Sequence, residues 1–263
     1  MDDINKELTL IRDEVASDFF EPFESCDLKE FLLGSSKMIR SQLAIFYLKT
    51  FNAEISIPLL KILAAGEIIH NASLLHDDIL DNAKTRRGVL TIGEKYSDKA
   101  SILAGDYLLT FAIKKLLELN NEKILSLFRE CTEKMTVSEI KQLQLRDKKT
   151  SFEDYIDICK NKTGLLFSTI LEACALIVGL DSNLAKELGL LFGIVFQIKN
   201  DLEETSAKQD KLNKIETVID ILGVEKTKDL LDNYHEEIKL LLDKIPNNEY
   251  KIRLEDLINK YVR

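Results

Sequence analysis

Residues 70–88 read HNASLLHDDILDNAKTRRG, and the segment that leads into them, 57–75, reads IPLLKILAAGEIIHNASLL. The leading segment is apolar over 19 residues and contains few turn signals, which predicts a buried α-helix rather than a strand. Leu, Ile, Lys and Glu recur with helical spacing along the rest of the chain, and strand-like alternation is scarce. The sequence therefore predicts an all-α fold.

Acidic side chains gather at the end of this predicted helix. His70, Asp77 and Asp81 fall on one helical face, and Asp78 lies beside it. Ionised carboxylates at the end of a buried helix have a large desolvation cost unless a cation compensates them. An alternative is that DDILD merely ends the helix, but aspartates favour the opposite, N-terminal end. The pattern favours a charged site.

Two arginines, Arg86 and Arg87, follow the acidic group within a short distance, and Gly88 comes directly after them. Their guanidinium groups stay charged and bind phosphate oxygens in pairs. Carboxylates beside arginines suit a magnesium-bound phosphate or diphosphate. We therefore expect an anionic, metal-bound ligand at this end of the helix.

A second acidic helix is predicted over 186–205, KELGLLFGIVFQIKNDLEET. A polar stripe runs along it, with Asn200 beside the stripe, and its members are Gly193, Gln197, Asp201, Glu204 and Lys208. Polar stripes at this spacing are also common on ordinary bundle helices. If the two acidic helices face each other, they could hold divalent cations between them. Oxygen ligands and only three histidines favour Mg²⁺ over zinc or iron.

Composition narrows the class of protein. The 263 residues include three prolines and ten glycines, and no linker or repeat interrupts them, which favours a single domain over 1–263. The net charge of −9, without a basic stripe, argues against a nucleic-acid partner. Four scattered cysteines and an N-terminus without a secretory signal predict a cytoplasmic protein. The longest apolar runs are too short to span a bilayer, so no transmembrane segment is expected.

Taken together, these motifs resemble the trans-polyprenyl diphosphate synthase family. The family's first aspartate-rich motif, DDxxD followed by RRG, is matched by Asp77, Asp78, Asp81, Arg86, Arg87 and Gly88. FQIKNDLEE (196–204) resembles the second motif, and further blocks occur in the family's order at 105–112, 139–143 and 161–167. The resemblance covers about residues 30–215. It implies an isoprenoid-synthase helical bundle around a central apolar cavity, and a homodimer.

The resemblance also implies a reaction. Isopentenyl diphosphate is joined to C1 of an allylic diphosphate, and inorganic diphosphate leaves and takes the final proton, so no side-chain base is expected. The implied Mg²⁺ ligands are Asp77, Asp81 and Asp201, supported by Asp78 and Glu204. Arg86, Lys162 and Lys208 would stabilise the charge on the departing diphosphate. Thr163 and Gln197 would contact the allylic site.

A second, metal-free pocket is implied for isopentenyl diphosphate. Lys37 and Arg40, within GSSKMIRS (34–41), resemble the family's GGKRxRP block, and Arg87 and His70 would complete the pocket. Without the family context, Lys37 and Arg40 could equally be a solvated helix start, and His70 a satisfied core histidine.

Four positions depart from the family pattern. Met38 replaces the second basic residue of that block, and Ser41 replaces its proline. In the second motif Asn200 replaces the first aspartate and Glu204 the third. An amide offers an oxygen ligand but lacks the charge that holds Mg²⁺.

Product length is the last expectation drawn from the resemblance. In the family, bulky residues four and five positions before the first aspartate stop chain growth early. Here those positions hold Ser73 and Ala72, which are both small. We therefore expect geranylgeranyl diphosphate (C20) or a longer product, with a farnesyl diphosphate synthase as the alternative.

Three other classes of protein share some of these sequence features. A helical phosphohydrolase would use His70 and His76 as metal ligands, but their side chains point about 120° apart on one helix. A terpene cyclase would share the fold, yet it would not need the pocket of Lys37 and Arg40. A weakly active partner subunit of a heteromeric synthase fits Asn200 and Glu204. Activity of the purified chain alone distinguishes that subunit from an enzyme.

Overall fold

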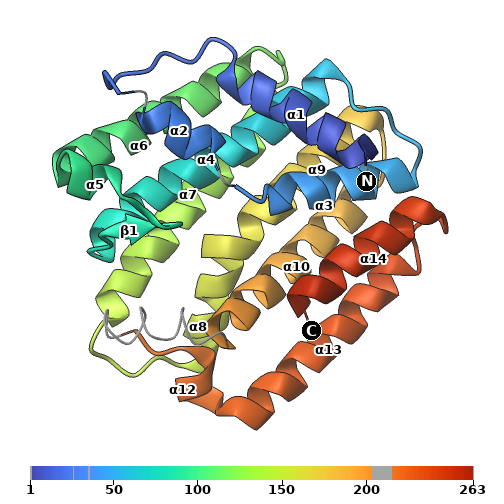
Figure 1. The fold of residues 1–263 in the computed structure, drawn as a ribbon. Coiled ribbons are helices and arrows are strands. Elements are labelled where there is room, and N and C mark those ends of the chain that lie inside the picture. Colours follow the sequence, from blue (N-terminus) through green and yellow to red (C-terminus); the bar gives the residue numbers. More distant parts are fainter. Residues whose placement is uncertain (1, 26, 35, 203–214, 263) are drawn as a thin grey trace. The chain divides into compact units, whose positions relative to one another are not determined.

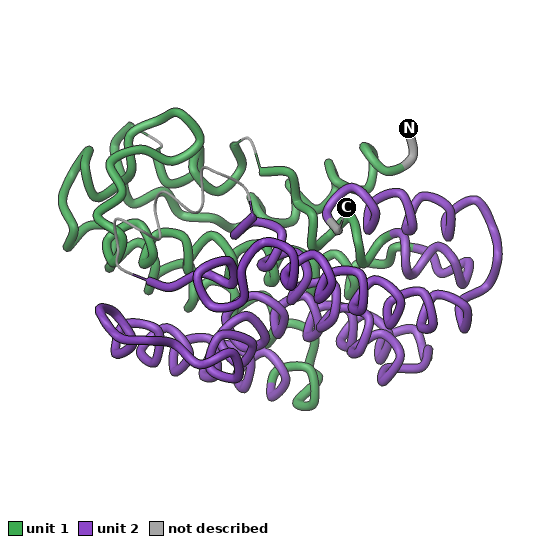
Figure 2. Tube along the Cα trace, turned by 90° about the horizontal axis from the view of Figure 1, so that it is seen from below, with its two compact units in different colours: residues 1–45, 55–125 green, residues 46–54, 126–263 purple. Residues whose placement is uncertain are grey.

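The computed structural model describes residues 2–25, 27–34, 36–202 and 215–262, which are predominantly helical (Figure 1). The chain divides into two compact units, drawn in different colours in Figure 2. Unit 1 comprises residues 1–45 and 55–125, and unit 2 comprises residues 46–54 and 126–263. The all-α prediction is confirmed. A single domain over 1–263 and a central apolar cavity stay predictions.

Unit 1 is a set of helices with one small hairpin. Its elements are α1 (Asp2–Ala16), α2 (Asp27–Leu33), the start of α3 (Ile39–Thr50), α4 (Ile57–Leu80), β1 (Thr85–Arg86), β2 (Val89–Leu90), α5 (Ile92–Lys95) and α6 (Asp98–Leu117).

The long helix α4 is the core of unit 1, as its apolar sequence predicts. Pro58 lies in its first turn, where a missing amide hydrogen costs nothing. α4 packs against α6, and also against α1, α2 and α5. The contact with α6 is close, because a Cβ atom on Gly105 would lie 2.2 Å from Nε2 of His76. The helix ends at Leu80, and the amide of Asp81 still donates to the carbonyl of Asp77 (2.8 Å).

A two-residue hairpin, which the sequence analysis did not predict, follows α4. β1 and β2 pair antiparallel, with Thr85 opposite Leu90 and Arg86 opposite Val89. The connecting residues Arg87 and Gly88 both have positive φ, 53° and 83°. Two positive φ values define the type I′ turn, which fits the twist of a tight hairpin. The turn directs the chain back toward the end of α4.

All regular elements in the described part of unit 2 are helical, including the end of α3 from Phe46 on. Its elements are α7 (Glu122–Leu145, from Ser126 on), α8 (Phe152–Ile158), the π-helical turn η1 (Cys159–Gly164), α9 (Leu165–Val178), α10 (Ser182–Leu202), α12 (Val218–Leu222), α13 (Val224–Leu242) and α14 (Glu249–Val262).

The centre of unit 2 is α10, which contacts α9, η1, α12, α13 and α14. Glycines let it approach its neighbours closely. A Cβ atom on Gly193 would lie only 2.5 Å from Cα of Gly164, and one on Gly189 would lie 2.8 Å from backbone atoms of Phe167. The helix predicted over 186–205 is confirmed up to Leu202. Its polar stripe begins with Gly193, whose role is close helix packing.

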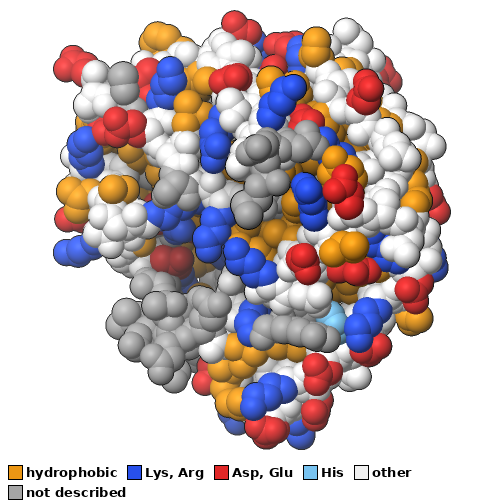
Figure 3. Space-filling model, turned by 45° about the vertical axis from the view of Figure 1, so that its right-hand side comes forward, with side chains coloured by type: hydrophobic (Ala, Val, Ile, Leu, Met, Phe, Trp, Pro, Cys, Tyr) orange, Lys and Arg blue, Asp and Glu red, His pale blue; other side chains and the backbone are white. Residues whose placement is uncertain are grey.

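Two segments, 57–80 and 152–178, are long and apolar enough to cross a bilayer by length and composition, although 61% of each apolar window is buried within the protein. Buried core helices of soluble proteins also reach this length and apolarity. The absence of a transmembrane segment therefore stays a prediction. On the face drawn in Figure 3, acidic and basic side chains are interspersed among apolar ones.

Candidate functional site

The three aspartates of the first acidic motif differ in burial. Asp78 is 1% exposed, whereas Asp77 and Asp81 are half-buried at the end of α4. Neighbouring positions on a helix face different directions, so Asp78 points into unit 1 while Asp77 and Asp81, one turn apart, share another face. Only the latter two have the exposure that a ligand for a solvated ion or diphosphate requires.

The buried Asp78 forms an ion pair with Arg86 of the hairpin. Nε of Arg86 donates to Oδ1 of Asp78 at 2.6 Å, and the described part of the chain offers Oδ2 of Asp78 no hydrogen bond. Burial raises the pKa of Asp78 above its ordinary value, although the Arg86 guanidinium opposes that shift. Asp78 therefore ties the hairpin to α4, a role that the sequence analysis did not assign to it.

Arg40, Arg86 and Arg87 lie near enough to His70 for their charges to act on it, and these four residues constitute the cationic pocket of unit 1. Burial lowers the pKa of the half-buried His70 well below 6.5, and the charges of these three arginines lower it further. His70 is consequently neutral at neutral pH and offers a hydrogen bond rather than a charge. Three of the four residues expected in the isopentenyl diphosphate pocket, Arg40, Arg87 and His70, thus lie near one another. The fourth, Lys37, is exposed just before α3.

One acidic side chain, Glu67, lies beside this cationic pocket. It is 3% exposed, and its Oε1 accepts hydrogen bonds from the amide (3.2 Å) and hydroxyl (2.7 Å) of Ser41. Burial and the charge of Arg86 lower the pKa of Arg87, while Glu67 and Asp78 act in the opposite direction. Glu67 was not among the predicted site residues, although it lies three residues before His70 and thus on the same face of α4.

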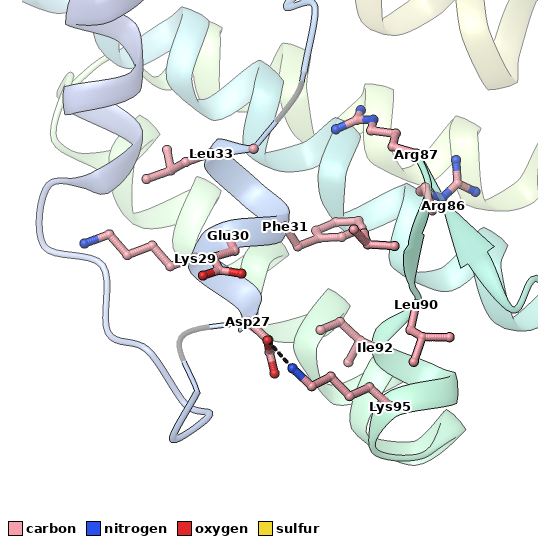
Figure 4. A pocket seen from close by; sticks show the side chains of 12 residues that line it. Asp27, Lys29, Glu30, Phe31, Leu33, Arg86, Arg87, Leu90, Ile92 and Lys95 are labelled. Carbon is pink, nitrogen blue, oxygen red and sulfur yellow. Dashed lines mark hydrogen bonds and ion pairs between the residues drawn. The ribbon is translucent and has the colours of Figure 1, made fainter.

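A groove of about 890 Å³ lies between α2 and the hairpin with α5 (Figure 4). Arg86 and Arg87 lie at one end, and an ion pair between Asp27 and Lys95 (2.5 Å) lies at the other. Phe31, Leu90 and Ile92 line the apolar stretch between them. The two arginines are therefore accessible from this groove.

In unit 2 the carboxylate of Asp201 is 3% exposed and fully engaged. The hydroxyl of Tyr155 donates to its Oδ2 (2.6 Å), and Nε2 of Gln197 donates to its Oδ1 (2.9 Å). Thr163 in turn donates to Oε1 of Gln197 (2.9 Å). Burial raises the pKa of Asp201, and the hydrogen bonds from Tyr155 and Gln197 oppose that shift. Hydrogen bonds therefore link Thr163, Gln197 and Asp201, three of the expected site residues, and their roles stay predictions.

Tyr155 was not among the predicted residues. It lies on α8, 46 residues from Asp201. Only the packing of unit 2 brings the two together, and no local pattern around Tyr155 indicates it.

Lys162 lies on the π-helical turn η1, an irregularity that is frequent at functional sites. Its Nζ contacts Oε2 of Glu139 (2.5 Å) and Oε1 of Gln142 (2.8 Å), both on α7. Asn200 is half-buried near the end of α10. Glu204 and Lys208 lie outside the described residues.

The two positions expected to set product length are small and lie within α4. Ala72 is fully buried. Ser73 is half-buried, and its hydroxyl donates to the carbonyl of His70 (2.8 Å).

The residues near the end of α4 fit a magnesium ion in chemical type. Mg²⁺ is usually held by one or two carboxylates, several waters and the phosphates of a substrate, and the half-buried Asp77 and Asp81 can supply the carboxylates. Across the described ranges, no three His, Cys, Asp or Glu side chains converge in a geometry that would hold a metal by protein ligands alone.

The fold and these sites define an isoprenoid-synthase type of protein. The polyprenyl synthetase family model matches residues 27–240, and the chain belongs to that family. A decaprenyl-diphosphate synthase of Dictyostelium discoideum is 31% identical over 191 residues, 72% of this chain and 42% of the relative. A geranylgeranyl diphosphate synthase of Saccharolobus solfataricus is 32% identical over 220 residues, 76% of this chain and 66% of the relative.

Solved structures extend the likeness over the whole chain. An isoprenoid synthase family member from Thermotoga neapolitana is 28% identical, with a TM-score of 0.84, and the match covers 97% of this chain and 98% of that one. The matches to the first curated relatives span about half of those proteins' length, between 35% and 62%. The fold and the family are thereby established.

Proposed function

We propose that the protein is a Mg²⁺-dependent prenyltransferase that condenses isopentenyl diphosphate with an allylic diphosphate. One observation supports this most: in unit 1 the charges of Arg40, Arg86 and Arg87 act on His70, and Arg86 pairs with Asp78 at the end of α4. Guanidinium groups bind diphosphate oxygens in pairs, and the neutral His70 can donate one further hydrogen bond. The half-buried carboxylates of Asp77 and Asp81 suit a separate, metal-bound diphosphate.

The proposed reaction breaks the C1–O bond of the allylic diphosphate and forms a new carbon–carbon bond to isopentenyl diphosphate. Negative charge develops on the departing oxygen, where Arg86 would stabilise it. The resemblance to the family assigns the same role to Lys162. When bound, Mg²⁺ would add to that stabilisation as a Lewis acid. Arg40, Arg87 and His70 would hold the second diphosphate in place. By resemblance to the family, the departing diphosphate takes the proton that the new product loses.

The residues of unit 2 in this proposal are Lys162, Thr163, Gln197 and Asp201, together with Glu204 and Lys208 by resemblance alone. By resemblance to the family, we propose Asp201 as a Mg²⁺ ligand whose carboxylate is oriented by Tyr155 and Gln197. Asn200 would offer a neutral oxygen at the metal.

A product assay tests the function. Purified protein, Mg²⁺ and labelled isopentenyl diphosphate are supplied in turn with C5, C10 and C15 allylic primers, and the products are sized by chromatography. An elongated diphosphate is the expected result. A folded protein that binds the diphosphates and yields no product from any primer would contradict the proposal and favour the partner-subunit alternative.

Within this function we propose a product of C20 or longer, because small residues, Ala72 and Ser73, occupy the two positions at which bulky side chains stop chain growth in the family. The relatives described above are named for C20 and decaprenyl products. Replacing Ser73 with phenylalanine is expected to shift the main product to C15, since a ring there would block chain growth. Radiolabelled products sized by reversed-phase chromatography check this. An unchanged product distribution in an active Ser73→Phe variant would contradict this explanation of length.

We also propose a homodimer, formed through α6. Its exposed side presents a stripe of large apolar side chains that unit 1 does not cover, namely Ile102, Leu103, Ile113 and Leu117. Replacing Leu103 (68% exposed) with glutamate is expected to raise the dimer dissociation constant at least about tenfold, because a buried charge would be unpaired.

Sedimentation velocity over a concentration series measures that change. Leu240→Glu on α13 is the matched control, since Leu240 is 65% exposed and lies off the stripe. Equal dissociation constants for both variants would exclude α6 as the interface.

A further inference from the structure

The first turn of α3 is held by a side chain from another helix. Oε1 of Glu67, on α4, accepts from the backbone amide of Ser41 (3.2 Å) and from its hydroxyl (2.7 Å). Both residues are buried, with exposures of 3% and 1%. Two donors on one carboxylate oxygen fix its position relative to the α3 backbone.

The position of Ser41 explains why this contact matters for α3. The helix begins at Ile39, so the amide of Ser41 lies in the first turn, where backbone donors have no partner within the helix. The next amide, of Gln42, already bonds to the carbonyl of Met38 (2.9 Å). Glu67 therefore caps α3 from outside, and a carboxylate at a helix N-terminus is also favoured by the helix dipole.

The surroundings of Glu67 leave little room for solvent. Together with Asn71, Met38 and other side chains, it lines a cavity of only about 10 Å³, which is at most the space of one water molecule. A buried carboxylate needs compensation from the protein. The two donors of Ser41 and the nearby charge of Arg87 supply it.

The same turn holds a residue of the cationic pocket, because Arg40 directly precedes Ser41. Arg40 is 9% exposed and lies close enough to His70 to lower its pKa. Glu67 thus interacts with the cationic pocket in two ways. It accepts a hydrogen bond from the backbone next to Arg40, and its charge acts on Arg87. A proline at position 41 has no amide hydrogen, so Ser41 gives this chain a contact that the usual family residue cannot make.

We propose that Glu67 is a positioning residue: with Ser41, it holds Arg40 and Arg87 in the geometry that binds the metal-free diphosphate of isopentenyl diphosphate. The proposal rests on the proposed function. It differs from a purely electrostatic role, since removing a negative charge beside arginines would by itself strengthen the binding of an anion.

Three variants separate the two roles. Glu67→Ala removes the acceptor and is expected to raise the KM for isopentenyl diphosphate about tenfold, the effect of losing a hydrogen bond to a charged group. Glu67→Gln keeps an acceptor oxygen and should recover most of that loss. Ser41→Ala removes one of the two donors and should lie between wild type and Glu67→Ala. The KM of the allylic primer should stay unchanged in all three variants.

Ser101→Ala is the matched control. The Ser101 hydroxyl is fully buried and donates to the α4 carbonyl of Leu75 (3.0 Å), away from the cationic pocket. Its loss should leave both KM values unchanged. If Glu67→Ala does not fold, Ser41→Ala against Ser101→Ala decides. A lower or unchanged KM for isopentenyl diphosphate in Glu67→Ala, or in Ser41→Ala when that variant decides, overturns the proposal.

A binding measurement separates this inference from the proposed function. Inorganic diphosphate is added in excess EDTA, which removes the metal-dependent site, and the rise in melting temperature is recorded. Wild type should be stabilised, Glu67→Ala much less, and Ser101→Ala as much as wild type. This result in a protein without prenyltransferase activity would keep the positioning role and refute the function. Equal stabilisation of all variants in an active enzyme would refute the positioning role and keep the proposed function.

Discussion

Replacing Asp77 with asparagine is expected to lower kcat/KM for the allylic diphosphate by about 10²–10³-fold, the effect of removing one group that stabilises transition-state charge. Asparagine keeps the shape of the side chain but loses the charge that would attract Mg²⁺. Because Asp77 is half-buried, the melting temperature in metal-free buffer should hardly change. Steady-state kinetics over a Mg²⁺ titration measure the loss, and a higher Mg²⁺ requirement should accompany it.

Asp229→Asn serves as the control for Asp77→Asn, since Asp229 is an exposed aspartate on α13 in unit 2. It should retain wild-type kinetics. An Asp77→Asn protein with nearly full activity at limiting Mg²⁺ would show that Asp77 is not a metal ligand.

Replacing Arg86 with methionine is expected to lower the free energy of unfolding by about 3–5 kcal/mol, because the carboxylate of Asp78 would be left buried without its cation. Methionine retains most of the aliphatic length of arginine, so lost packing contributes little. Arg86 is 27% exposed by side chain and the Asp78 side chain is 0% exposed, so the cost arises on the aspartate. Urea denaturation in EDTA at pH 7 measures it.

Two further proteins test this explanation of the Arg86 loss. The double variant Arg86→Met, Asp78→Asn should recover much of the stability, since no buried charge remains. Lys239→Met, which removes the exposed pair of Lys239 and Glu236 on α13, should cost less than about 0.5 kcal/mol. If Arg86→Met loses under 1 kcal/mol, the ion pair does not anchor the hairpin.

The helices around the site follow from the sequence, because apolar content and 3.6-residue spacing persist over α4 and α10. The sequence does not predict which of the aspartates is buried. Asp77 and Asp78 are adjacent, and a rotation of α4 by one residue would exchange their roles; packing against α6, including the close approach of Gly105 and His76, fixes that rotation. The pattern of residues therefore indicates a charged helix end without saying which carboxylate faces inward.

The hairpin and the hydrogen bonds to Asp201 and Glu67 could not be predicted for a related reason. β1 and β2 contain two residues each, too few for an alternating pattern to be visible. The contacts of Tyr155 with Asp201 and of Ser41 with Glu67 join residues 46 and 26 positions apart. No local sequence pattern indicates such pairs, because the tertiary packing of each unit brings them together.

In the type I′ turn at Arg87 and Gly88, backbone stability and diphosphate binding favour different residues at position 87. An arginine with positive φ is disfavoured by about 1–2 kcal/mol relative to a helical or extended backbone, whereas glycine or asparagine would relax there. A search for more stable variants would therefore favour replacing Arg87 and would remove a charge from the diphosphate pocket. Selection for thermostability alone would thus erode substrate recognition at this turn, which makes position 87 one to hold constant in any engineering of the chain.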